Sequence, residues 1–94
     1  MYYYVDMKYE VWMSGKFNKI IRQMPSNAKE TLYRLIEDIK ISGPVQPGYH
    51  NYSKLGENTY HCHLAYRWVA CWRNEKGKLI VEVEYVGSRE KAPY

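Results

Sequence analysis

The spacing of apolar residues changes from a strand period to a helix period and back along this chain. Apolar and polar residues alternate over residues 3–13, which predicts a strand with one buried face. Residues Phe17–Met24 carry apolar side chains three and four positions apart, the pattern of a short helix that Pro25 ends. Ser26 is expected to cap a second helix, which stops before Gly43. Three further runs are rich in β-forming residues: Thr59–Ala65, Arg67–Arg73 and Lys78–Val86.

This order of elements predicts an α+β fold of the form β-α-α-β-β-β, with residues 1–94 in a single domain. Two N-terminal helices are expected to pack on one face of a roughly four-stranded antiparallel sheet, leaving the other face free for a ligand. Residues 43–53 form the one long loop, where functional residues tend to sit. The expected core consists of Leu32, Leu35, Ile36, Ile39, Val81 and Val83.

Composition limits the class of partner. Fourteen Lys and Arg against ten Asp and Glu give a net charge of +4 and a pI near 9.0, which favours a polyanion such as nucleic acid. Eleven tyrosines can pack a small sheet and stack on unpaired bases. The sequence has neither a recognisable signal peptide nor the run of about 20 apolar residues that spans a bilayer, so we expect a cytoplasmic protein.

Two cysteines are too few for a disulfide scaffold. If Tyr66 and Arg67 form a hairpin tip, Cys62 lies directly opposite Cys71, where disulfide geometry is poor. We therefore expect two free thiols.

Cationic and imidazole side chains cluster in the second half of the chain. His61 and His63 lie two apart on an expected strand and so share a face. Cleavage of RNA needs a base for the 2′-OH, cations for the charged phosphorane and an acid for the 5′-oxygen, and such residues can supply all three. The simpler alternative is that the histidines pack or lie at the surface. A metal site would need carboxylate or thiolate ligands at zinc-like spacing, which are missing, so we expect neither metal nor cofactor.

Four short motifs follow one another in the second half of the chain: Ser53-Lys54-Leu55-Gly56, Thr59-Tyr60-His61-Cys62-His63-Leu64, Tyr66-Arg67-Trp68-Val69 and Tyr85-Val86-Gly87-Ser88-Arg89. Their order resembles that in the RelE/ParE superfamily of toxins from toxin–antitoxin systems. The resemblance extends over nearly the whole chain, including the short helix before Pro25.

The resemblance implies a ribosome-dependent mRNA endonuclease that works without a metal and is neutralised by an antitoxin. Lys54 and Arg67 would lie against phosphate. His63 would be the acid or base, with His61 and Tyr94 as alternates, and Arg89 would occupy a position of arginine or histidine in the family. Further expected RNA contacts are His50, Tyr52, Arg73 and Lys91.

Two other functions fit the same resemblance. One is a ParE-like inhibitor of DNA gyrase that does not cut RNA, and the other is an inactive antitoxin-binding module. Members of the gyrase-inhibiting group usually lack the full His, Arg, Lys and Tyr set, which favours the nuclease.

Overall fold

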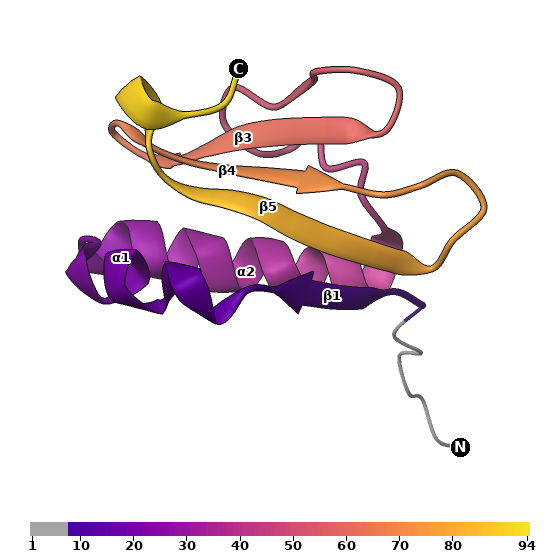
Figure 1. Cartoon of the computed structure of the whole chain (residues 1–94), viewed down its shortest axis with the longest axis horizontal. Helices are drawn as coiled ribbons and strands as arrows, with labels where there is room; N and C mark the ends of the chain where they lie inside the picture. Colours follow the sequence, from indigo (N-terminus) through magenta and orange to yellow (C-terminus); the bar gives the residue numbers. More distant parts are fainter. Residues whose placement is uncertain (1–7) are drawn as a thin grey trace.

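The computed structural model describes residues 8–94 (Figure 1). Strand β1 (Glu10–Met13) leads through a 3-10 turn, η1 (Gly15–Phe17), into helices α1 (Asn18–Gln23) and α2 (Ser26–Ser42). After the long loop come the remaining elements: β2 (Ser53–Lys54), β3 (Thr59–Ala65), β4 (Trp68–Arg73), β5 (Ile80–Ser88) and a second 3-10 turn, η2 (Arg89–Lys91). The part of the first expected strand that falls on residues 3–7 lies outside the described residues.

The five strands form one sheet in the order β1-β5-β4-β3-β2, and α1 and α2 lie on the same side of it (Figure 1). The predicted α+β fold, with both helices on one face, is confirmed. One pairing is parallel, that of β1 with β5. The parallel pairing follows from the direction of the chain. Helix α2 returns the chain to the end of the sheet where β1 begins, so β3 has the same direction as β1. Strand β4 then runs in the opposite direction, and β5 again has the direction of β1.

The expected core lies between the helices and the sheet. Leu32, Leu35 and Ile39 of α2 are buried with Val81 and Val83 of β5, and Ile36 is partly buried against them. Trp72 of β4 is also buried, and its indole N–H donates to the carbonyl of Pro44 at 2.8 Å. This bond fixes the start of the long loop against the sheet, which helps to place the residues that follow it.

The predicted helix cap is wrong. Ser26 is the first residue of α2, and Pro25 precedes it as the cap, without a side-chain hydrogen bond to the helix. Pro25 is extended there, with φ fixed by its ring in the range that leads into a first turn. Ser14 caps η1, where its hydroxyl accepts from the Lys16 N–H at 3.2 Å.

The predicted pairing of the cysteines is also wrong. Cys62 pairs with Ala70, and Cys71 pairs with His61, because a bulge between His63 and Ala65 shifts the register. Cys62 therefore lies in the core under the helices, whereas Cys71 faces the other way. Both cysteines are buried and free. Within residues 8–94, no helix has the length and apolar character needed to cross a membrane.

Candidate active site

The sheet face turned away from α1 and α2, here called the open face, carries a row of imidazole rings. His61 and His63 project from β3 onto it, opposite Cys71 and Val69 of β4, and their ring centroids lie 5.9 Å apart. His50, from the long loop, continues the row at 5.9 Å from His63. The His63 N–H donates to the His50 carbonyl at 2.8 Å, so the backbone itself holds these two residues together.

Each strand histidine has a polar partner that also comes from the loop or its end. The Nδ1 atom of His61 lies 2.9 Å from the Ser53 hydroxyl, and that of His63 lies 3.4 Å from the Asn51 amide nitrogen. The sequence pattern does not predict Ser53 or Asn51 as partners of these histidines. It places both residues in the long loop, but it does not show that this loop contacts β3.

Both strand imidazoles are held towards their neutral forms. His61 is only 8% exposed, and this burial lowers its pKa. Burial also lowers the pKa of His63, and the positive charges of His61, Arg89 and His50 lower it further. A neutral imidazole can accept a proton, so either ring can serve as a base near neutral pH.

Arg67 and Arg89 lie at the end of the sheet near His63. Arg67 is in the β3–β4 turn and Arg89 follows β5, and the Arg89 N–H donates to the Arg67 carbonyl at 2.6 Å. Both residues are exposed, and neither forms an ion pair with any acidic residue of the described chain. Arg89 is close enough to His63 for its charge to lower the pKa of that imidazole, and Arg67 is bonded to Arg89 through the backbone, so both arginines are available to an anion at this end of the sheet.

The chain after η2 folds back over the open face and places Tyr94 on His61. The two ring centroids are 4.4 Å apart, with the rings tilted by 51°. Burial is the main cause that raises the pKa of the Tyr94 phenol, while Arg89 lowers it. The phenol is half-exposed and keeps its proton near neutral pH, so it can act as a proton donor.

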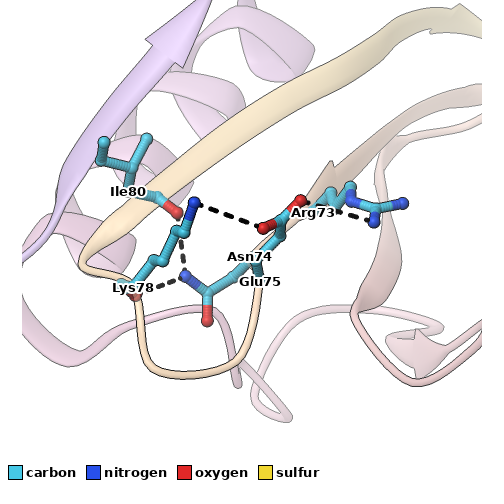
Figure 2. Close-up of polar contacts among 5 residues, drawn as sticks. All are labelled: Arg73, Asn74, Glu75, Lys78 and Ile80. Carbon is cyan, nitrogen blue, oxygen red and sulfur yellow. Dashed lines mark hydrogen bonds and ion pairs between the residues drawn. The ribbon is translucent and has the colours of Figure 1, made fainter.

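Four of the predicted site residues lie away from this cluster or at its margin. Lys54 pairs with Tyr60, which faces the helices, and its ammonium lies 5.9 Å from that ring. Tyr52 stacks beside the same ring at 6.3 Å and is half-buried. Figure 2 shows Arg73 beside Glu75 in the β4–β5 turn, with an ion-pair distance of 3.8 Å. Lys91 is exposed in η2.

The row of histidines also borders a groove between α2 and the long loop. Its volume is about 530 Å³, and His50 and His63 form one wall. Arg34 and Asp38 of α2 and Tyr49 of the loop form another, with the Tyr49 hydroxyl bonded to the Asp38 carboxylate. The helix pattern gave no signal for Arg34 or Asp38 because polar residues on a helix are expected at the surface.

The arrangement supplies a base, two cations and an acid within one face. Among residues 8–94, no group of three or more His, Cys, Asp or Glu side chains is placed to hold a metal ion. The imidazoles and the phenol can transfer protons, and the arginines can stabilise negative charge.

No protein-family model matches the sequence, and no curated protein matches it significantly. Solved structures do resemble it. A chain of the archaeal RelE–RelB complex from Pyrococcus horikoshii has a TM-score of 0.70 at 10% identity, covering 92% of this chain and 100% of that one. Free E. coli toxin RelE with two arginines replaced by alanine has a TM-score of 0.66 at 18% identity, covering 92% and 88%. YoeB from Staphylococcus aureus, solved as a dimer, has a TM-score of 0.65 at 12% identity, covering 85% and 95%.

The arrangement of helices and sheet thus defines an α+β protein with one face free of helices. More narrowly, the chain has the fold of the RelE-like toxins.

Proposed function

We propose that this chain is the toxin of a toxin–antitoxin module and cleaves mRNA on the ribosome, in the cytoplasm. The cleavage is a metal-independent attack of a 2′-OH on the adjacent phosphate. The observation that carries the proposal is the position of His63, an imidazole kept neutral by its surroundings, beside two exposed arginines that have no acidic partner in the described chain. The RelE-like fold supports the same function.

The proposed reaction uses four side chains. His63 accepts the 2′-OH proton as the 2′-oxygen bonds to phosphorus. Arg67 and Arg89 stabilise the negative charge that builds on the phosphoryl oxygens. Tyr94 gives its proton to the departing 5′-oxygen, and the products are a 2′,3′-cyclic phosphate and a free 5′-OH.

The remaining predicted residues would position the reacting groups or bind RNA. His61 positions Tyr94 and is an alternate proton carrier. His50 and Lys91 contact RNA at the margins of the open face. Lys54, Tyr52 and Arg73 would meet the RNA only outside the reacting centre. Lys54 and Tyr52 lie beside Tyr60, whose side chain faces the helices, and Arg73 is the last residue of β4, next to Glu75.

The partner proposed is an antitoxin encoded beside the toxin, as the RelE–RelB complex suggests by its fold relationship. A stable complex should bury more than roughly 1,000 Å². Co-expression of the neighbouring gene should restore growth, and its product should co-purify with this chain. Failure of every adjacent reading frame to bind would contradict this part of the proposal.

The direct test is induced expression followed by primer-extension mapping of mRNA. Cuts within translated regions are expected, and in a purified translation system they should form in the presence of EDTA. A control variant, Arg22→Ala on the exposed side of α1, should cut like the parent. Intact mRNA together with gyrase stalled on DNA would replace the nuclease by the ParE-like function, and no effect on either would leave the inactive antitoxin-binding module.

A further inference from the structure

Tyr66 occupies a conformation that tyrosine rarely adopts. Ala65 pairs with Trp68, which leaves Tyr66 and Arg67 as a two-residue hairpin loop between β3 and β4. Tyr66 has φ of 51°. Short hairpin loops require such positive φ values, which glycine and asparagine supply with little strain, whereas a bulky side chain is unfavourable there. Among the described residues, the other non-glycine position with positive φ is Asn51, a residue type that tolerates it.

Packing does not explain the presence of this ring. Tyr66 is 82% exposed, more than any other large hydrophobic side chain of residues 8–94. A tyrosine that strains the turn and contributes little to the core is the kind of residue that a ligand contact would account for.

The surroundings of Tyr66 indicate the chemistry of that ligand. Arg67 follows it directly, and Arg89 is tied by its N–H to the Arg67 carbonyl. An exposed aromatic ring in the same short segment as an exposed arginine, with a second exposed arginine bonded to that segment through its backbone, matches unpaired nucleic acid. In such a complex a base stacks on the ring while phosphates meet the cations. The ring also stands in the same hairpin as His63, three positions further along the chain.

We propose that Tyr66 is a stacking platform for an unpaired RNA base that flanks the cleaved phosphate. The proposal rests on the proposed function in taking RNA as the substrate. Because the hairpin is tight, the backbone of Tyr66 is held close to Arg67 and His63. A base stacked on the ring would therefore influence which nucleotide reaches the reacting centre.

Tyr66→Gly provides a sharp test, since it removes the ring and relieves the unfavourable φ at the same time. Its Tm should be equal to or above that of the parent. Its affinity for a single-stranded RNA of about 12 nucleotides should fall roughly 10-fold, as expected for the loss of one stacked base. Fluorescence anisotropy with a labelled, cleavage-resistant 2′-O-methyl strand measures this. Tyr66→Trp should bind like the parent, and so should Tyr33→Ala, a control at a half-exposed tyrosine of α2.

A fully paired RNA duplex separates stacking from charge. Tyr66→Gly should bind the duplex like the parent because no base is free to stack, whereas Arg67→Ala should weaken both complexes. Unchanged affinity of Tyr66→Gly for single strands, or an equal loss for duplex and single strand, would overturn the platform. Tyr66→Asn, which also tolerates positive φ, repeats the test in a second sequence.

The platform and the nuclease can fail separately. Tyr66-dependent binding of single strands without any cleavage on ribosomes would support the platform and remove the nuclease. Cleavage by Tyr66→Gly at parental rates and positions would keep the nuclease and remove the platform. A parent protein that neither binds the single strand nor cleaves mRNA on ribosomes would contradict both.

Discussion

The Tyr94 ring lies tilted over the His61 imidazole, with 4.4 Å between the ring centroids. His61 is buried and hydrogen-bonded to the Ser53 hydroxyl, so the ring that Tyr94 contacts is held in place. The proposed proton donor therefore depends on His61 for its place. His61→Ala should lower single-turnover cleavage, and Tyr94→Phe should add little further loss in that variant. A double-mutant cycle measures the coupling, and fully additive losses would separate the two residues.

His63 and Arg89 should contribute to the rate of cleavage, by stabilising the transition state, more than to the binding of the ribosome. His63→Gln or Arg89→Ala should reduce single-turnover cleavage on ribosomes by roughly 10²-fold or more, the usual contribution of one acid–base or electrostatic group. Ribosome binding should change far less because many phosphate contacts share it. Equal losses in binding and cleavage would assign these residues to affinity instead.

The lowered pKa values of His61 and His63 predict how stability depends on pH. In the unfolded chain these imidazoles take up protons near pH 6.5, whereas in the folded chain they do so only at lower pH. Unfolding is therefore favoured as pH falls from about 6.5 through the folded pKa values. Urea denaturation between pH 8 and pH 5 should show this loss. A variant with both residues changed to glutamine should have a flatter profile, and a slope equal to the parent's would contradict the assignment.

The two thiols should resist alkylation in the folded protein. Burial raises the pKa of Cys62 to about 12, and burial with the nearby Glu84 does the same for Cys71. Almost no thiolate, the reactive form, is then present at pH 8. Mass spectrometry should show slow iodoacetamide modification of the native protein and two fast modifications in denaturant. A native mass two daltons below the reduced value would reveal a disulfide instead.

Gly87 is needed for the close approach of Tyr85. A Cβ at position 87 would lie 2.6 Å from the Tyr85 hydroxyl oxygen, which donates to the Ser88 carbonyl at 2.7 Å. Gly87→Ala should therefore displace that ring and lower the free energy of unfolding by about 1–3 kcal/mol. The same change should be much less destabilising when Tyr85 is already alanine. Equal effects in the two backgrounds, measured by urea denaturation, would exclude this contact as the cause.

The sequence predicted what local periodicity determines. The apolar stripe of α2 identified Leu32, Leu35 and Ile39, because burial of one helix face leaves a period near 3.6. The run of β-forming residues likewise predicted the bounds of β3, Thr59–Ala65. A period of two shows which side of a strand is buried but not which strand lies beside it, so the parallel neighbour of β1 was not foreseen.

The candidate site was predictable in residue type and less so in position. His61 and His63 share a face because they lie two apart on a strand, which needs no knowledge of the fold. The motif that contains Lys54 predicted that this residue lies with the histidines. Strand β2 has only two residues, too few for a pattern that would show the pairing of Lys54 with Tyr60. The bulge after His63 adds a single residue to β3. It leaves the local pattern of hydrophobicity intact, so the sequence does not reveal it, but it changes which residues of β4 the cysteines face.

The parallel pairing of β1 with β5 has a consequence for the order of folding. Glu10 lies beside Ile80, so this contact closes a loop that includes most of the chain. The hairpin of β3 and β4 and its extension by β5 join neighbours in sequence and can form early, whereas the entropy of loop closure delays β1. Until β1 docks, the edge of β5 that it will cover, at Val81 and Val83, has unpaired backbone groups. A strand from another chain can pair with this edge, so intermolecular association competes with the docking of β1.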